Sequence, residues 1–478
     1  MKKWYNEFAN FFFCSATNVN YMKILITEKL KNLAEDCGFP LYAVGGCVRD
    51  ALAGLKSSGD VDICAPVSAE IFVAAAEKSG AKINAVYKNT GTVKLSFGEE
   101  QYEFASFRSD SYVRGVHTPV NTFFTDDILL DARRRDFKCN AVYYDIKSES
   151  LVDPLGGAED ISAARITTVA DAEKVFGEDG LRLMRLARQS AQLNFTPTAD
   201  CLEGAKRNAR LAADVAPERI YAELNEILHA DGRYGAQYAQ YRGLKILDET
   251  RVLDVILPEL SEGRGMTQNE KFHLYDVLEH SLRAVKYADP SVRLASLLHD
   301  VGKPVRMRAD GNYHGHESDS ARVAADICAR FKVPKKTSAE VVTLCALHMY
   351  DLRCDARESK VRRFIVDNLA VFDKLLSVKQ ADYSGCRDDL SEAPAVAKFK
   401  AIYADMVREN VPMTCAMLHV RGDELIAAGV EKRNVGDVLH MLLHECVTKN
   451  ICNERQALIK RALGINASGI HINKQTFN

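Results

Sequence analysis

A pair of aspartates behind a glycine turn is the first group of residues whose types and spacing suit chemistry. Asp60 and Asp62 are separated by one residue in DVDICAP at 60–66. On a strand both carboxylates would lie on one face, where they can bind Mg²⁺ together with substrate phosphates. Upstream, Gly45 and Gly46 would let the backbone approach a phosphate, and the helix after them would offer it amides. Each fragment alone is also typical of a tight turn or a solvated strand edge, so the prediction rests on their combination.

Arginines supply the second group. The segment GGCVRD at 45–50 contains Arg49, and ARRRDFKCNA at 132–141 contains Arg135, Asp136 and Asn140. A guanidinium makes forked hydrogen bonds, which suits contacts with a triphosphate or a ribose. Without the other motifs, the run of three arginines would be read as a solvated face.

The segment EDGLR at 178–182 pairs a carboxylate with a guanidinium. On one helix, Asp179 and Arg182 are three residues apart and share a face. One side chain accepts hydrogen bonds and the other donates them, so together they can read the Watson–Crick edge of a base. Arg185 and Arg188 continue this stripe and would reach phosphates or an RNA end. The alternative is a helix surface with a Glu178–Arg182 ion pair, worth about 0.2–0.5 kcal/mol.

Histidines and aspartates in the second half form a candidate for another metal site. Imidazoles with carboxylates suit Mn²⁺, Ni²⁺ or Fe²⁺, and such a metal can activate water for phosphoester hydrolysis. A single histidine here would more often be a helix residue whose ring is hydrogen-bonded within the protein. The presence of six candidate ligands is what favours a metal site. They are His280, His299, Asp300, His316, His348 and Asp382.

The elements that must position these residues alternate in the first third of the chain. Helical spacing predicts a helix over 23–37, and another is expected over 48–55. Strands are expected at 41–46, 60–66 and 141–147, and period-two alternation at 92–97 and 102–107 predicts a hairpin. Beyond about residue 150 the strand signals fade and long helical patterns follow. The fold class is therefore α+β, with a small sheet and its helices followed by a mostly helical remainder.

Length and composition bound the possibilities. The 478 residues suggest about three domains. With 47% hydrophobic and 27% charged residues, a disordered or fibrous chain is excluded. The net charge of −2 means that any nucleic-acid surface must be a local patch. Thirteen cysteines without a CxxC pair predict reduced thiols and a cytoplasmic protein. No apolar run approaches the ~20 residues that span a bilayer, so no membrane is expected.

The glycine turn, the aspartate pair and the arginine segment together resemble the class II tRNA nucleotidyltransferase (CCA-adding enzyme) and poly(A) polymerase family of the DNA polymerase β superfamily. In that family GGxVRD precedes a DxD pair that binds two metals, and an acidic residue on a neighbouring strand often completes the site. Glu103 is the candidate for this third acidic residue. Alternatively, Glu103 is simply an exposed carboxylate on a strand. The family's RRDF is usually followed by Thr, whereas this chain has Lys138. DPLGG at 153–157 and the segment from Pro217 resemble the motifs of the neck.

The resemblance implies addition of CCA, from CTP and ATP, to tRNA 3′ ends with release of pyrophosphate. Asp60 and Asp62 would hold two Mg²⁺ ions, and Asp179 and Arg182 would select the base as a protein template. The nucleotide-binding residues it implies are Gly45, Gly46, Arg49, Arg135, Asp136, Asn140, Asp179, Arg182, Arg185 and Arg188. The loop at 114–119 weakly favours the full CCA reaction. A poly(A) polymerase and a CC-adding or A-adding partial enzyme remain alternatives.

The histidines and aspartates resemble the HD phosphohydrolase superfamily, whose ligand order is H…HD…D. A phosphohydrolase is the alternative function from another class, and a non-catalytic RNA-binding module is a third. The expected divisions are a disordered extension at 1–21, a head at 22–150, a helical neck at 151–262, an HD domain at 263–390 and a helical body and tail for tRNA binding at 391–478. Basic residues at 449–474 would touch tRNA or form a solvated end. The tRNA acceptor end, CTP and ATP are the expected partners, and no obligate protein partner is evident.

Overall fold

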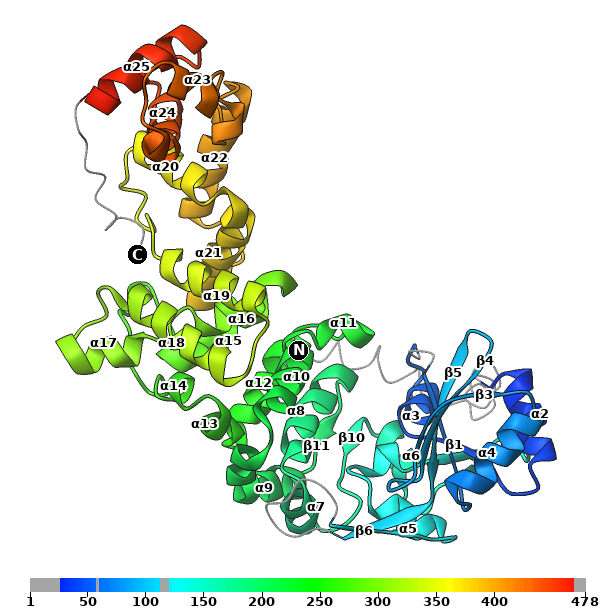
Figure 1. Ribbon diagram of the computed structural model, residues 1–478. Coiled ribbons are helices and arrows are strands. Elements are labelled where there is room, and N and C mark those ends of the chain that lie inside the picture. Colours follow the sequence, from blue (N-terminus) through cyan, green and yellow to red (C-terminus); the bar gives the residue numbers. More distant parts are fainter. Residues whose placement is uncertain (1–25, 57–59, 112–119, 468–478) are drawn as a thin grey trace. The chain divides into compact units, whose positions relative to one another are not determined.

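The computed structural model describes residues 26–56, 60–111 and 120–467. The chain divides into two compact units, Met1–Glu262 with Ile327–Val333 and Gly263–Asp326 with Pro334–Asn478 (Figure 1). Each unit is described by itself. The predicted extension at 1–21 and the loop at 114–119 lie outside the described residues.

A mixed sheet of seven strands forms the centre of the first part of unit 1. Its order is β3-β4-β5-β2-β1-β8-β9. The central strand β2 pairs antiparallel with β1 and parallel with β5. The strands are β1 Tyr42–Val44, β2 Val61–Ala65, β3 Lys82–Tyr87, β4 Thr92–Phe97, β5 Glu100–Ser106, β8 Tyr143–Asp145 and β9 Ser150–Val152. The predicted strands and the predicted β4–β5 hairpin are therefore confirmed.

Helices cover this sheet and anchor its core. Phe72 of α4 stacks on Phe104 of β5 with ring centroids 3.6 Å apart, and both rings are buried. The side chains of Thr27 and Ser68 cap α2 and α4 by accepting from backbone amides. These helices are α2 Glu28–Asp36, α3 Gly46–Leu52, α4 Ala69–Lys78, α5 Ile128–Arg133 and α6 Gly157–Ser162. Small ladders are added by β6 Arg108–Ser111 with β7 Asn121–Phe124 and by β10 Arg165–Ile166 with β11 Thr196–Pro197.

The rest of unit 1 is helical, as predicted. Its central helix, α8, is buried along most of its length and packs against α10 and α12. Pro217 occupies the first turn of α10, where its missing N–H costs no hydrogen bond. These helices are α7 Ala172–Glu178, α8 Leu181–Leu193, α9 Ala199–Asn208, α10 Pro217–Leu228, α11 Asp231–Tyr234, α12 Ala239–Glu249, α13 Val252–Ile256 and α14 Pro258–Ser261.

Among its described residues, unit 2 contains helices joined by loops and no strand. Helices α15 and α21 pack closely at Gly385, where an added Cβ would lie 2.8 Å from the backbone nitrogen of Ala284. Its helices begin with α15 Val277–Tyr287, α16 Arg293–Leu298, α17 Lys303–Asp310, α18 His316–Arg330, α19 Lys335–Leu347 and α20 Glu358–Asp367. They continue with α21 Phe372–Arg387, α22 Pro394–Arg408, α23 Gly422–Ala427, α24 Val435–Val447 and α25 Arg455–Ala467.

Two further predictions concern the whole chain. In the described residues every cysteine is a free thiol, as the scattered pattern predicts. Within the same residues, none of the helices has the length and apolar character needed to cross a membrane.

Candidate functional site

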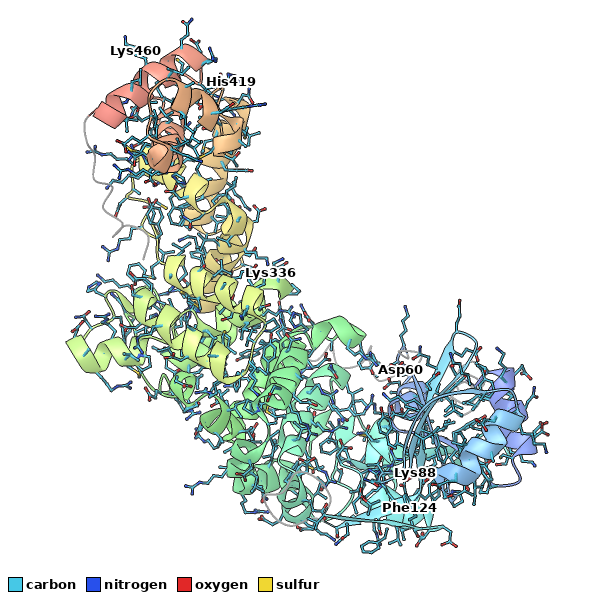
Figure 2. All side chains as sticks on the ribbon, viewed as in Figure 1. Asp60, Lys88, Phe124, Lys336, His419 and Lys460 are labelled. Carbon is cyan, nitrogen blue, oxygen red and sulfur yellow. The ribbon has the colours of Figure 1, made fainter. Side chains whose placement is uncertain are left out.

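The predicted carboxylates gather on the central strands of the sheet. Asp60, which Figure 2 labels, directly precedes β2, and Asp62 lies on this strand. Both aspartates are exposed, whereas Val61 and Ile63 are buried. The two aspartates therefore share one face of the strand. Asp62 is in register with Glu103 on the neighbouring parallel strand β5. Glu103 also forms a surface ion pair of 3.5 Å with Lys94.

Two neighbouring carboxylates act electrostatically on Asp62. Partial removal from water raises the pKa of Asp62 above its ordinary value, and the negative charges of Glu103 and Asp60 raise it further. The positive charge of Arg135 acts in the opposite direction. A cluster of carboxylates in which the charge of Asp62 is destabilised by its neighbours is a donor set that a hard divalent cation such as Mg²⁺ fits.

The glycine turn lies against this cluster. Gly45 has a φ of +83°, which side chains rarely tolerate. A Cβ added there would lie 3.5 Å from Asp62 Oδ2 and 3.9 Å from Arg135 Nη1. The glycine turn, the proposed metal ligand Asp62 and Arg135 are therefore close neighbours. Gly46 begins α3, where an added Cβ would lie 3.5 Å from Arg49 Nη2.

A buried carboxylate holds Arg135 in place. Asp131 Oδ2 accepts from Arg135 Nη2 at 3.1 Å and from the Tyr143 hydroxyl at 2.7 Å, and Asp131 Oδ1 accepts from Arg134 Nε at 2.7 Å. Burial alone would raise the pKa of Asp131, but Arg135, Arg134 and Tyr143 together lower it to about 2. Sequence reasoning missed Asp131 and Tyr143, because nothing in the local pattern shows that their side chains meet.

Arg49, Asp136 and Asn140 belong to a second buried network. Arg49 Nη1 donates to Asn140 Oδ1 at 2.7 Å, and Asn140 Nδ2 donates to Asp136 Oδ1 at 2.9 Å. Arg49 also donates to Asp50, whose other oxygen accepts from the Tyr234 hydroxyl at 2.6 Å. Asp136 in turn accepts from Arg185 Nε at 2.8 Å. These contacts join the glycine turn to α8, which was not foreseen.

The predicted base-reading pair does not lie on one helix, so that expectation is corrected. Helix α7 ends at Glu178, Asp179 has an extended backbone, and α8 begins at Leu181. The carboxylate of Asp179 accepts from the backbone N–H of Leu181 at 2.9 Å, a contact between residues two apart that stabilises the turn before α8. Asp179 and Gly180 thus form the junction between α7 and α8.

Arg182 is buried and bonded to the protein. Its Nη1 donates to Glu178 Oε2 at 2.8 Å and to the carbonyl of Val175 at 2.9 Å. Its Nη2 donates to the carbonyl of Arg134 at 2.8 Å. The ion pair named as the alternative is thus present, and Arg182 also ties α8 to the arginine segment. Further along α8, Arg188 donates to Glu223 Oε2 at 2.6 Å.

The six residues predicted for a second metal site come together inside unit 2, and all are buried. His280 Nε2 lies 3.1 Å from His299 Nε2 and 3.1 Å from Asp382 Oδ1. His299 Nε2 is 3.3 Å from Asp300 Oδ2. His316 Nε2 lies 2.9 Å from Asp300 Oδ1 and 3.3 Å from the Nε2 atom of the sixth residue, His348.

Three of the histidine rings are oriented by a hydrogen bond at the ring nitrogen that faces away from the cluster. The Nδ1 atoms of His299, His316 and His348 lie 2.7–2.8 Å from the backbone carbonyls of Ser296, Tyr313 and Cys345 respectively. This arrangement leaves each Nε2 directed at the cluster, as in metal sites whose ligand orientation is fixed by outer contacts.

The charges of this cluster are strongly coupled. Burial opposes ionisation of Asp300, yet the positive charges of His299 and Lys303 hold its pKa well below the ordinary value. The pKa of His299 rises to about 9, because Asp300 outweighs the opposing effect of burial. A cation can replace the protons that the cluster otherwise holds. The imidazole and carboxylate donors therefore fit a divalent transition metal.

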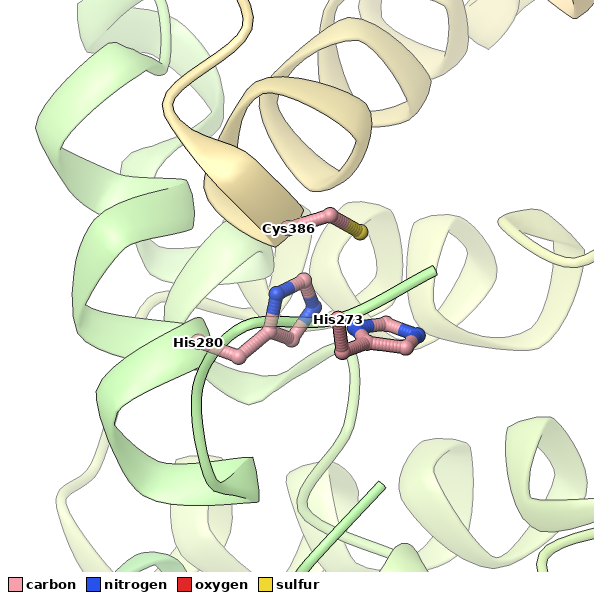
Figure 3. A group of neighbouring side chains, drawn as sticks. All are labelled: His273, His280 and Cys386. Atoms are coloured by element: carbon pink, nitrogen blue, oxygen red, sulfur yellow. The ribbon is translucent and has the colours of Figure 1, made fainter. Parts of the chain in front are cut away.

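Several residues of this region were not predicted. Lys303 Nζ donates to Asp300 Oδ2 and to Gln268 Oε1, both at 2.6 Å. His273 and Cys386 lie beside His280 (Figure 3). Cys386 follows Asp382 by four residues on α21, so helical spacing could have placed the two on one face. The loop residue His273 carries no such signal.

Basic residues of the last helices have acidic partners. Lys449 pairs with Glu409 at 2.7 Å. Arg455 pairs with Glu424, and Arg461 pairs with Glu445, each at 2.6 Å. These side chains form ion pairs at the surface, and their contact with tRNA stays a prediction.

Three family models match the chain. Residues 41–167 match the Poly A polymerase head domain, and residues 194–263 match the probable RNA and SrmB-binding site of polymerase A. Residues 273–369 match the HD domain. The matched segments contain the carboxylate cluster and five of the six residues of the second site, all except Asp382.

Named relatives are found among characterised proteins. An A-adding tRNA nucleotidyltransferase of Deinococcus radiodurans is 32% identical over 364 residues, covering 72% of this chain and 76% of the relative. A CCA-adding enzyme of Bacillus pumilus is 34% identical over 250 residues, covering 52% of this chain and 59% of the relative. The crystal structure of a Bacillus stearothermophilus CCA-adding enzyme in complex with CTP is 24% identical, with a TM-score of 0.64 and coverage of 94% and 98% of the two chains. That likeness shows a shared fold.

Proposed function

Because the chain belongs to the class II tRNA nucleotidyltransferase (CCA-adding enzyme) and poly(A) polymerase family, we propose that it adds CCA to tRNA 3′ ends from CTP and ATP. It is a nucleotidyltransferase with a helical body that includes an HD domain. The observation that carries the proposed mechanism is the cluster of Asp60, Asp62 and Glu103 beside Gly45 and Arg135.

Asp60 and Asp62 hold two Mg²⁺ ions in this proposal. When bound, these ions would activate the tRNA 3′-hydroxyl and neutralise charge on the triphosphate and the departing pyrophosphate. Arg135, fixed by Asp131, binds the triphosphate, since its guanidinium reaches the same turn as Asp62. Gly45 and Gly46 leave room for the phosphates. Arg49, Asp136 and Asn140 orient these groups through their buried hydrogen bonds and bind the sugar.

In the same proposal, Asp179 and Arg182 select the base of the incoming nucleotide. Arg182 is bonded to Glu178, so reading a base requires the guanidinium to exchange this partner for the nucleotide. Its contact with the carbonyl of Arg134 keeps α8 attached to the segment that carries Arg135. Arg185 and Arg188 lie further along α8 and would contact phosphates or the tRNA end.

The experiment that tests this function measures pyrophosphate release. The full chain is given Mg²⁺, CTP and a tRNA transcript that lacks CCA. Asp60→Ala and Asp62→Asn are expected to lose at least about 100-fold in kcat, as removal of an electrostatic stabiliser does. Asp36→Asn, at an exposed carboxylate of α2, is the matched control and should be unchanged. Full activity of Asp62→Asn would refute the proposed metal site.

One observation supports a different reaction product as the second candidate. The Deinococcus relative, which matches 72% of this chain, is named an A-adding enzyme. Addition of the terminal A alone is therefore the second candidate, and a poly(A) polymerase is the third. The acceptor end of tRNA is the proposed partner in the first two reactions, with recognition by shape and backbone.

The HD domain is proposed to hold a transition metal and to hydrolyse a phosphoester. Mn²⁺, Ni²⁺ and Fe²⁺ fit its four imidazoles and two carboxylates. The test is metal-dependent hydrolysis of a generic phosphodiester by the full chain, with His299→Ala as the variant. Asp60→Ala serves as the control, because it inactivates only the head. Hydrolysis that survives His299→Ala would exclude this site as its source.

A further inference from the structure

Two side chains that the proposed function does not use, those of His273 and Cys386, lie next to His280 of the HD site. The possible ligand atoms of these three residues all lie within 4.8 Å of one another (Figure 3). His273 lies in the segment before α15, His280 lies on α15 and Cys386 lies near the end of α21. The rings of His273 and His280 are perpendicular, with centroids 5.0 Å apart.

The backbone holds this group together. The N–H of Leu274 donates to the carbonyl of Cys386 at 3.0 Å, and Arg387 Nε donates to the carbonyl of Phe272 at 3.2 Å. These bonds attach the segment that carries His273 directly to the end of α21. The close packing of α15 on α21 at Gly385 brings His280 to the same place.

Two buried ring nitrogens of the group have no hydrogen-bond partner among the described residues. They are the Nδ1 atoms of His273 and His280, and the side chain of His280 is fully buried. A buried polar atom normally has a partner, and leaving it without one costs about 1–3 kcal/mol. The other ring nitrogen of His280 is already directed at Asp382 and His299. The side chains of His280 and Cys386 already interact with each other, and a ligand bound by both would satisfy an orphaned nitrogen.

We propose that His273, His280 and Cys386 form a thiol-containing position for a soft divalent transition metal, contiguous with the six-residue HD site. The six HD residues offer only nitrogen and oxygen, whereas this position adds sulfur, which suits Zn²⁺ or Co²⁺ and not Mg²⁺. Donor atoms that bind one ion at about 2.0–2.3 Å lie roughly 3.3–3.8 Å apart, so atoms within 4.8 Å of one another need to move closer by at most roughly 1–1.5 Å. This proposal rests on the proposed HD site, but it can be tested separately because only the new position forms a metal–sulfur bond.

The test is a Co²⁺ titration of the metal-free full chain followed by near-ultraviolet absorption. Thiolate coordinated to Co²⁺ gives a charge-transfer band, and we expect this band to saturate at one ion per chain. Cys386→Ser should abolish the band and weaken the binding of that ion by at least about tenfold. His273→Asn should weaken binding to a similar extent. Cys354→Ser, at a partly exposed thiol elsewhere in unit 2, is the matched control and should leave the band unchanged.

The same samples separate this inference from the HD site. Mn²⁺ counted by electron paramagnetic resonance reports on the six residues, and Asp300→Asn should lower that count while the Co²⁺ thiolate band remains. Circular dichroism of each variant shows whether it is folded. Absence of the band in the unchanged chain, or a band that survives Cys386→Ser, would overturn the thiol position. Neither result would bear on the Mn²⁺ count.

Discussion

Asp62 and Glu103 are register partners on the adjacent parallel strands β2 and β5. After partial burial, the charge of Glu103 is the largest cause of the raised pKa of Asp62. The fold thus places like charges together at the centre of its sheet, and a bound divalent cation would relieve the repulsion further than Arg135 does. This relationship makes Glu103 part of the proposed metal site.

Glu103→Gln should raise the Mg²⁺ concentration needed for half-maximal nucleotide addition by about tenfold, because the cluster loses one carboxylate. The measurement is the initial rate at saturating tRNA and CTP across a Mg²⁺ series. Lys94→Gln removes the ion-pair partner of Glu103 but keeps the carboxylate, so its Mg²⁺ dependence should stay within twofold, roughly the change expected of an exposed pair. Identical behaviour of the two variants would remove Glu103 from the site.

Gly45→Ala tests whether the glycine turn is needed for the space it leaves. A side chain at a φ of +83° costs about 1–3 kcal/mol of stability, and its Cβ would crowd Asp62 and Arg135. Gly38→Ala is a matched control, since its φ is +78° but no atom lies within 4 Å of the added Cβ. Both variants should lose stability in urea unfolding, and only Gly45→Ala should lose activity. Equal activities would contradict a functional role of the turn.

Asp131 should make the stability of the protein depend on pH in the acid range. Its folded-state pKa of about 2 is below the ordinary value of about 3.9, so its contribution is complete above about pH 5 and is lost as the pH falls. The contribution is roughly 2–3 kcal/mol for a buried carboxylate with this shift. Asp131→Asn should cost about 3–5 kcal/mol at pH 7, because Arg134 and Arg135 lose a buried partner.

The check on Asp131 is the free energy of unfolding of the chain and of Asp131→Asn between pH 3 and pH 7. The difference between the two should shrink as the pH is lowered. A constant difference across this range would show that the carboxylate is not the titrating group.

Asp179→Ala should change which nucleotide is incorporated. The variant loses the acceptor proposed to read the base and also the hydrogen bond from the backbone N–H of Leu181, worth about 0.5–1.5 kcal/mol. We expect the ratio of kcat/KM for CTP to that for UTP to fall by about tenfold or more. Asp200→Ala, at an exposed carboxylate in the first turn of α9, is the control and should keep the ratio. A lower rate with an unchanged ratio would indicate a purely structural role.

The sequence predicted the elements whose side chains alternate clearly between core and solvent. Strand β2 shows this pattern around Asp62, and β4 and β5 show it on both sides of the hairpin. Strand β3, Lys82–Tyr87, was not predicted, because it lies at the edge of the sheet and most of its side chains remain at least partly exposed. An edge strand of this kind lacks the burial signal on which the prediction depends.

The candidate sites were predicted unequally for a similar reason. Asp60 and Asp62 carry a spacing that local geometry can interpret, and the six HD residues follow an order that resembles the HD superfamily. Asp131 and His273 owe their roles to contacts with distant residues, which no local pattern reveals. The placement of Asp179 and Arg182 on one helix was wrong, because the chain breaks between α7 and α8.

The central claim is tested most directly by the products formed on tRNA transcripts that end before CCA, after the first C, and after CC. Each transcript is incubated with the full chain, Mg²⁺ and CTP, ATP or both, and the products are sized at single-nucleotide resolution beside Asp60→Ala. The account predicts that all three transcripts are extended to CCA and no further, and that Asp60→Ala extends none. A long ladder of A without incorporation of C, or extension that persists in Asp60→Ala, would contradict it.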